Sequence, residues 1–400
     1  MNVLVLNAGS SSLKFRLLRM RPAEQVLASG QVEKWGTPQA SLRMEASGRS
    51  PERRSVAAET PAHAAEHAIE ACRPLGIDAL GHRVVHGGAK FRDPTRISPE
   101  TIAGIREVSH LAPLHNGLAL AGIEAGLRLL PDVPAVAVFD TAFHRTIPDV
   151  AALYAIPSEL AQKHSLRRFG FHGISHQYVS GRLLECLRRP VAGTRLITCH
   201  LGNGASLCAI RDGRSIDTSM GFTPMEGLVM GTRSGDIDPG LLLHLLTTVR
   251  LHAQQVDELL NRRSGLLGLS GRSGDVREIE QAAAAGDARA HLALEIFAYR
   301  VRKYIGAYAA VLGGIDALAF AAGVGEHSAD ARSRICRDLS YLGASLDGAR
   351  NDSATGDDPF PISTEASSVQ IWVIPTDEER QIAREIVELL AGPVAWATLP

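Results

Sequence analysis

The sequence is poor in the features that mark several large classes of protein. No run of 18 apolar residues offers a membrane span. The first apolar run, residues 3–6, is too short and too soon interrupted for a signal peptide. A formal net charge of −1 gives no basic surface for nucleic acid or an anionic membrane. Five cysteines, an odd number without any CxxC pair, predict reduced thiols in a cytoplasmic protein.

The usual nucleotide-binding and metal-binding motifs are also missing. There is no G-x-x-x-x-G-K-[ST] of a P-loop nucleotidase and no G-x-G-x-x-G of a dinucleotide site or a protein-kinase loop. His82 and His86, and separately His172 and His176, have i, i+4 spacing. The first pair lies in a strand-like segment and neither pair carries the glutamate of HExxH, which argues against a zinc site.

What the chain does contain is enough apolar sequence, 45% of 400 residues, to bury more than one core. Apolar runs alternate with helical segments, which predicts an α/β fold. In the first part we expect a hairpin made of residues 1–7 and 13–20, and a helix at residues 61–72. We also expect buried strands at 78–85 and 134–140, and between them a helix from about residue 116 to 130, before Pro131.

The second part repeats the opening pattern of strand, small-residue turn and strand. We expect a helix at residues 178–189 and a hairpin pair at 195–219, with a turn at Asp212-Gly213. Helices should dominate residues 239–312, followed by a strand and turn at 316–326, a last strand at 369–375 and a closing helix at 377–390. This weak repeat predicts two similar α/β halves.

Three turns of small residues follow apolar strands, at residues 7–12, 200–206 and 322–326. Such turns leave backbone N–H groups uncovered and let a phosphate approach closely. Any one of them could be an ordinary tight turn, but three in one chain favour a nucleotide site. Because hairpin turns would then hold the nucleotide, we expect two α/β domains around a cleft, an architecture of the sugar kinase, actin and Hsp70 type. The predicted domains are residues 1–150, joined by the C-terminal helix 378–400, and a nucleotide-binding domain at 151–377.

Four polar residues stand in apolar or glycine-rich settings: Arg83, Asp140, His172 and Arg233. Taken singly, Arg83 could form a structural ion pair, His172 could be a hydrogen-bonded core histidine, and Asp140 could cap a helix. Together with Lys14, one of only five lysines, they form the set of groups that phosphoryl transfer requires. That reaction mainly needs donor and acceptor aligned and the charge on the oxygens neutralised.

Nine segments, in order and over nearly the whole chain, resemble those of the acetate kinase family: LVLNAGSSSLKF, GHRVVHGG, LAPLHNG, FDTAFH, FGFHGISH, HLGNGAS, MGFTPMEGLVMGTRSGDIDP, AGVGEHS and VIPTDEE. The resemblance implies reversible in-line transfer of the γ-phosphoryl group of ATP to acetate, giving acetyl phosphate and ADP. It also implies Mg²⁺, with Mn²⁺ as an alternative, and a homodimer. The implied partners are acetate and ATP, with no nucleic acid and no membrane.

The resemblance also implies roles for individual residues. Asn7 and Glu378 would place the metal ion, and Lys14 would lie on the nucleotide phosphates. The remaining nucleotide contacts would come from three segments: His200, Leu201, Gly202, Asn203 and Gly204; Asp275, Val276 and Arg277; and Gly323, Val324, Gly325, Glu326 and His327.

Arg83 would hold the substrate carboxylate, and His172 and Arg233 would stabilise the transferring phosphoryl group. A small pocket for the methyl group would be lined by Val85, Leu114, Phe171 and Pro224. Asp140 is often given a proton-transfer role in this family, but acetate is already ionised at pH 7. We therefore prefer an orienting role for Asp140, fixing Arg83, Arg233 or a metal-bound water.

Three other functions are alternatives to an acetate kinase. A propionate or butyrate kinase differs from an acetate kinase by one or two methylenes in the pocket, which the sequence does not resolve. A non-catalytic ATP-driven switch, comparable to actin or a chaperone, would not need Arg83 and Arg233. An NAD-dependent dehydrogenase is disfavoured by the missing dinucleotide fingerprint.

Overall fold

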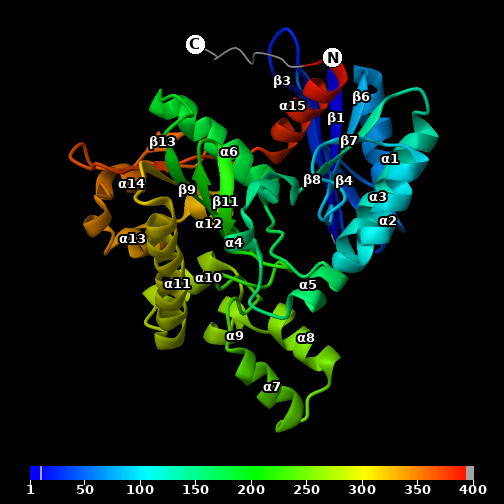
Figure 1. Cartoon of the computed structure of the whole chain (residues 1–400). Helices are drawn as coiled ribbons and strands as arrows, with labels where there is room; N and C mark the ends of the chain where they lie inside the picture. The colour runs from blue at the N-terminus through cyan, green and yellow to red at the C-terminus, as the bar shows by residue number, and fades with distance from the viewer. Residues whose placement is uncertain (10, 393–400) are drawn as a thin grey trace. The chain divides into compact units, whose positions relative to one another are not determined.

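The computed structural model describes residues 1–9 and 11–392, without the side chain of Leu114. The chain forms two compact units (Figure 1). The first contains Met1–Ala142 and the C-terminal segment from Asp377, and the second contains Phe143–Thr376. The domain limits given above stay a prediction, because a domain is defined by independent folding.

The first unit is built on an eight-stranded sheet of order β5-β4-β3-β2-β1-β6-β8-β7. Strands β1 to β5 are antiparallel neighbours, whereas β1, β6 and β8 run parallel. Four consecutive buried residues, 3–6, place β1 at the centre, where a strand is covered on both faces. The strands are β1 (Asn2–Ala8), β2 (Ser12–Arg19), β3 (Gln25–Glu33), β4 (Ser41–Ala46), β5 (Glu52–Ser55), β6 (Ala79–Val84), β7 (Thr95–Arg96) and β8 (Ala135–Phe139).

Helices cover both faces of this sheet. Gly81 in β6 lies against Ile382 and Ile386 of one helix, and its neighbour His82 lies against Gly126 of another. Since successive residues of a strand point to opposite faces, α15 and α3 cover opposite sides of the sheet. The helices are α1 (Pro61–Cys72), α2 (Pro99–Val108), α3 (Pro113–Leu129) and α15 (Glu378–Ala391).

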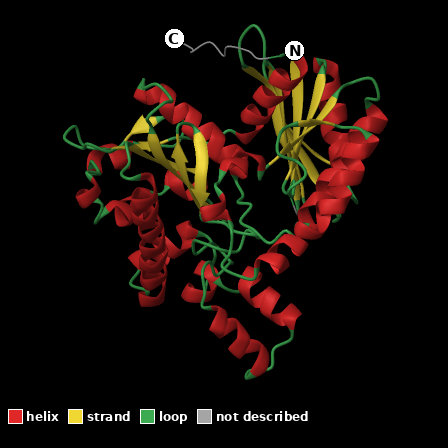
Figure 2. Ribbon diagram, in the orientation of Figure 1, coloured by secondary structure: helices red, strands yellow, loops and turns green. Residues whose placement is uncertain are grey.

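The second unit also has a sheet with helices around it (Figure 2). This sheet has six strands in the order β11-β10-β9-β12-β14-β13. Strands β9 to β11 are antiparallel, and β9, β12 and β14 run parallel, as β1, β6 and β8 do in the first unit. The prediction of two similar α/β halves is therefore confirmed. The strands are β9 (Arg195–Leu201), β10 (Ala205–Arg211), β11 (Arg214–Thr218), β12 (Ala317–Ala321), β13 (Phe360–Pro361) and β14 (Gln370–Val373).

The second unit also contains most of the helices. They are α4 (Asp149–Ala152), α5 (Ser158–His164), α6 (Gly173–Leu187), α7 (Pro239–Thr247), α8 (Ala253–Arg262), α9 (Gly265–Ser270), α10 (Val276–Ala284), α11 (Ala288–Leu312), α12 (Ala322–His327), α13 (Ala329–Cys336) and α14 (Gly348–Ser353). Across the described parts of both units, no helix combines the length and apolar character needed to cross a membrane.

Several element boundaries differ from the sequence prediction. Both hairpins are confirmed, but α3 begins at Pro113 rather than Asn116, because a proline suits the first position of a helix. Helix α6 begins at Gly173, five residues before the predicted start. The predicted turn at residues 322–326 is wrong, since β12 leads directly into helix α12.

Candidate active site

The first unit gathers an arginine and several oxygen ligands at the carboxyl ends of its parallel strands. Arg83 is in β6, and Asp140 directly follows the neighbouring strand β8. Arg83 Nη2 donates to Asp140 Oδ2 at 2.8 Å, and Asp140 is 1% exposed. Charge-assisted pairs of this kind fix the orientation of a guanidinium group. Asp140 therefore holds the side chain that was predicted to bind the substrate carboxylate.

Two further groups reach Arg83 from other elements. Asn7 at the end of β1 accepts from Arg83 Nη1 at 3.4 Å, and Glu378 in the first turn of α15 lies 3.6 Å from Arg83 Nε. Among the described residues, that buried Nε–H has no hydrogen-bond partner. Asn7 Nδ2 donates to Glu379 Oε1 at 3.2 Å. The strand ends and the helix N-terminus thus bring together residues that are far apart in the sequence.

Negative charge is in slight excess in this cluster. The pKa of Glu378 is raised to about 7, chiefly by burial and also by the neighbouring Asp140 and Glu379, against the opposing effect of Arg83 and Lys14. Lys14 lies opposite Asn7 in the β1–β2 pair. A cation bound near Glu378 would relieve this repulsion.

The donor chemistry suits magnesium bound through the substrate. In the described part of the chain, no group of three or more His, Cys, Asp or Glu side chains forms a metal cage. Mg²⁺ is commonly held by one or two carboxylates, waters and substrate phosphates. Asn7 and Glu378 supply one amide and one carboxylate oxygen, which fits that mode of binding.

In the second unit, a glycine turn between β9 and β10 lies beside His172 and Arg233. A Cβ placed on Gly204 would be 3.3 Å from His172 Nε2 and 3.5 Å from Arg233 Nη1. Glycine therefore lets both side chains approach the turn. Gly202 N donates to Gly204 O at 3.0 Å, which closes the turn. The structure thus brings together two of the residues predicted to act on the phosphoryl group.

Arg233 carries a charge that no carboxylate in the described chain neutralises. Its Nη1 donates to the carbonyl oxygen of Pro224 at 2.9 Å. Burial lowers the pKa of Arg233 from its usual value. A partly buried guanidinium held by a neutral carbonyl remains available to an anion.

His172 occupies an unusual backbone position at the start of α6. Its φ of 55° lies in the left-handed region, which costs free energy for a residue other than glycine and is often found at functional sites. The ring stacks on His200, with centroids 4.1 Å apart and planes 21° from parallel. His200 Nδ1 in turn lies 2.7 Å from Ser175 Oγ.

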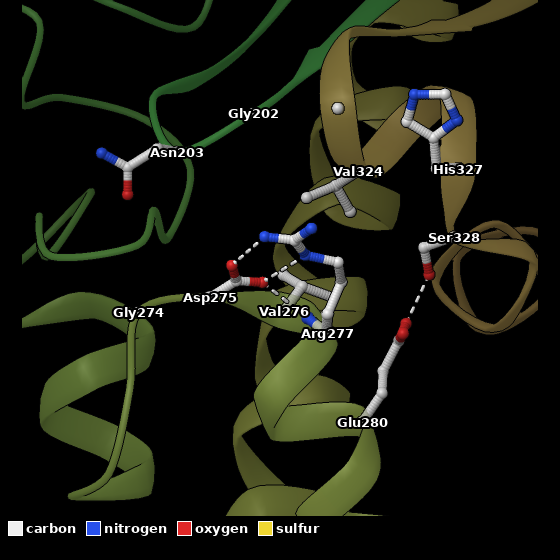
Figure 3. Close-up of a pocket in the computed structure, with 11 residues that line it drawn as sticks. Gly202, Asn203, Gly274, Asp275, Val276, Arg277, Glu280, Val324, His327 and Ser328 are labelled. Atoms are coloured by element: carbon white, nitrogen blue, oxygen red, sulfur yellow. Dashed lines mark hydrogen bonds and ion pairs between the residues drawn. The ribbon is translucent and has the colours of Figure 1, made fainter. Parts of the chain in front are cut away.

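A cavity of about 590 Å³ adjoins the Gly202 turn (Figure 3). Asp275 caps α10 by accepting from Arg277 N at 2.9 Å, and its carboxylate also pairs with the Arg277 guanidinium. A pocket of this size is within the range that holds a small-molecule ligand. Eleven residues line the cavity: Gly202, Asn203, Gly274, Asp275, Val276, Arg277, Glu280, Gly323, Val324, His327 and Ser328.

Eight of these lining residues were predicted from the sequence, and three were missed. Glu280 is one helical turn after Val276 on α10, so the helical period could have found it. Ser328 donates to Glu280 and caps α13 through Ala331 N. Gly274 packs against the Gly231 backbone, a contact between distant segments that the sequence does not reveal.

Six residues predicted to contact the nucleotide are not among those lining the cavity: Lys14, His200, Leu201, Gly204, Gly325 and Glu326. Leu201 is fully buried. Glu326 accepts from Ala322 N at 2.7 Å and Thr376 N at 2.8 Å, so this carboxylate holds the start of its own helix. Gly204 lies instead beside His172 and Arg233.

Four residues were predicted to line the methyl pocket. Val85 is 8% exposed and lies just past the end of β6, so strand alternation does not fix its direction. Phe171 is buried, and Pro224 receives the hydrogen bond from Arg233. The side chain of Leu114 lies outside the described part of the structure. The pocket stays a prediction.

The chain is similar to known proteins over almost its whole length. Residues 2–384 match the model of the Acetokinase family. Acetate kinases of Geobacillus kaustophilus and Bacillus subtilis are 50% and 47% identical over 396 residues, covering 97% of this chain and 98% and 99% of theirs.

Two crystal structures are similar in fold over almost their entire length. The Porphyromonas gingivalis acetate kinase has a TM-score of 0.91 at 45% identity, covering 97% of this chain and 99% of that one. A propionate kinase from Francisella tularensis has a TM-score of 0.89 at 40% identity, covering 96% and 98%. Together, the match from residue 2 to residue 384 and the relatives at about half identity mean that the chain belongs to the acetokinase family.

Proposed function

We propose that the protein is an acetate kinase, which transfers the γ-phosphoryl group of ATP to acetate and gives acetyl phosphate and ADP reversibly. The observation that carries this proposal is the meeting of His172 Nε2 and Arg233 Nη1 at the Gly204 turn. Gly202 and Asn203 of the same turn line a cavity large enough for a nucleoside. Family membership supports the choice of a carboxylate as the acceptor.

The proposed reaction needs no general base. An acetate oxygen attacks the γ-phosphorus while the bond to the β,γ-bridging oxygen breaks, and ADP leaves with that electron pair. The acceptor is already a carboxylate at neutral pH, so no proton has to be removed. His172 and Arg233 would donate hydrogen bonds to the phosphoryl oxygens, where charge develops in the transition state.

Arg83 would hold the acetate carboxylate, and Asp140 would orient Arg83. The 2.8 Å ion pair between the two side chains supports this division of roles. Asn7 and Glu378 would hold Mg²⁺ together with phosphate oxygens, and Lys14 would pair with the phosphates. The metal ion, when bound, neutralises charge on the phosphates during transfer.

Three further features of the proposal rest on the family resemblance. We infer that Mn²⁺ can replace Mg²⁺, that the protein works in the cytoplasm and that it is a homodimer. Light scattering of the purified full-length chain measures the last of these directly.

The test of the proposed function is an assay that traps acyl phosphates with hydroxylamine. The protein is incubated with ATP, Mg²⁺ and each carboxylate from formate to butyrate. We expect trapped acyl hydroxamate with acetate, and less with longer acids. Higher kcat/KM for propionate would instead assign the chain to propionate kinases such as its Francisella tularensis relative. The absence of product with every acid would disprove acyl kinase activity.

A further inference from the structure

A continuous row of polar side chains leads from the sheet of the second unit to His172. Thr198 in β9 lies with its Oγ1 2.7 Å from His176 Nδ1. His176 Nε2 lies 2.8 Å from Ser206 Oγ, and Ser206 Oγ lies 2.8 Å from His172 Nδ1. His172 precedes α6 as its N-cap and His176 lies in the first turn of the helix, and both rings contact the same serine.

The direction of these hydrogen bonds follows from counting donors and acceptors, starting at Thr198. Thr198 is 1% exposed, and the described structure gives its hydroxyl no other hydrogen-bond partner than His176 Nδ1. A buried hydroxyl rarely leaves its proton unpaired. Thr198 must therefore donate, and His176 Nδ1 must accept.

The same argument carries through His176 to Ser206. Burial holds the pKa of His176 well below its usual range, so the ring is neutral and has one proton. Since Nδ1 accepts, that proton is on Nε2 and is donated to Ser206 Oγ. Ser206 is fully buried, and its remaining described partner is His172 Nδ1. Its own proton must therefore go to that nitrogen.

We propose that Ser206 is a positioning residue that fixes the tautomer of His172, so that neutral His172 carries its proton on Nε2. This inference rests on the proposed function for its catalytic meaning. Nε2 is the nitrogen next to Gly204 and Arg233 Nη1. His172 would therefore present an N–H donor, rather than a lone pair, to a phosphoryl oxygen bound there.

The direct test is the protonation of the His172 ring in the full-length protein labelled with ¹⁵N-histidine. Protonated and unprotonated ring nitrogens have well separated ¹⁵N shifts, and the spectrum of His172→Gln identifies the His172 signals by their loss. We expect Nε2 protonated and Nδ1 unprotonated in the wild-type protein. A proton on Nδ1, alone or in addition to Nε2 at neutral pH, would overturn the proposal.

Variants separate positioning from packing. Ser206→Ala should let the His172 tautomers mix and lower kcat roughly tenfold while both KM values change less than about twofold. Ser206→Thr keeps the hydroxyl and should restore most of kcat. Thr198→Val acts from the far end of the row and should also mix the tautomers, which keeps the test available if Ser206→Ala does not fold.

The matched control is Ser215→Ala. Ser215 is also fully buried and contacts a histidine, His144, at 2.8 Å. The His144 ring packs edge-on against His176, but Ser215 is not one of the hydrogen-bonded residues of the row that ends at His172. It should lower the unfolding midpoint but leave kcat and the His172 spectrum unchanged. An unchanged kcat and spectrum in Ser206→Ala would refute the positioning role. A wild-type protein that forms no acyl phosphate would instead refute the proposed function, while the spectrum still tests the tautomer.

Discussion

Arg233 is a cation without a carboxylate partner in the described structure, held by the Pro224 carbonyl beside the Gly204 turn. If it acts on charge that develops during transfer, Arg233→Ala should lower kcat by roughly 100-fold, while KM for ATP changes little. The control is Arg263→Ala, an exposed arginine of the same unit, which should keep full activity. Loss of acetate affinity alone would assign Arg233 to ground-state binding.

Val85 is the residue predicted to limit the length of the acyl chain that the substrate pocket accepts. If it limits the methyl pocket, Val85→Ala should raise kcat/KM for propionate relative to acetate by roughly tenfold, the value of about one methylene. The ratio is measured together with the unfolding midpoint. If Val85 is only a core residue, the variant will be less stable and the ratio will not change.

At the scale of secondary-structure elements, helix α12 is held by one buried side chain. Arg332 is fully buried and donates to the carbonyl oxygens of Gly325 and Glu326, both at 2.9 Å, and to Asn351. These contacts fix the C-terminal end of the helix whose first turn lines the cavity. Arg332 thus links a buried charge to the shape of the predicted nucleotide site.

Arg332→Met should therefore destabilise the protein by about 3 kcal/mol or more, since it leaves several buried acceptors unpaired. KM for ATP should rise in the same variant, because α12 loses its anchor. Urea denaturation and steady-state kinetics measure the two effects. The control Arg337→Met removes an exposed arginine and its partly exposed ion pair with Glu295, and should cost about 1 kcal/mol or less.

The elements also show what could be predicted from the sequence. The runs of buried residues in β1 and the strand–turn–strand pattern of β9 and β10 follow from local periodicity, so both hairpins were found. The helix at residues 322–327 was missed because a glycine-rich segment is a poor helix former, and Glu326 stabilises it through Ala322 N.

The candidate site was predicted in part for a similar reason. Motifs identify residues such as Asp275 and Val324 that line the cavity. They do not reveal Gly274 or the row from Thr198 to His172, because these depend on contacts between distant segments. Such contacts exist only after the strands and helices have assembled.

At the scale of the whole molecule, buried neutral histidines make stability depend on pH. Burial lowers the pKa of His82 to about 4, and this ring is 2% exposed. In the unfolded chain the His82 ring binds a proton as the pH falls below about 6.5, whereas in the folded protein it binds one only near pH 4. The contribution of neutral His82 to the free energy of unfolding is therefore fully present above pH 6.5. It is lost as the pH falls toward 4, which lowers the free energy of unfolding by about 3 kcal/mol.

We therefore expect His82→Met to flatten the pH dependence of the free energy of unfolding between pH 7 and 4. Urea denaturation at a series of pH values measures it. His164→Met, which removes an exposed histidine, is the control and should keep the wild-type slope. An equally steep decline in His82→Met would assign the acid sensitivity to other groups.

The order in which the first unit is assembled follows from helix α15, which comes from the far end of the chain. Ile382 and Ile386 of this helix cover Gly81 on one face of the sheet. On the ribosome, α15 can cover that face only after all of Phe143–Thr376 has been synthesised, which takes on the order of tens of seconds. The nascent chain therefore exposes an uncovered apolar sheet face while its second unit is being synthesised. Glu378, the residue proposed to bind the metal, is the first residue of α15 and is made only when the helix that covers this face is made.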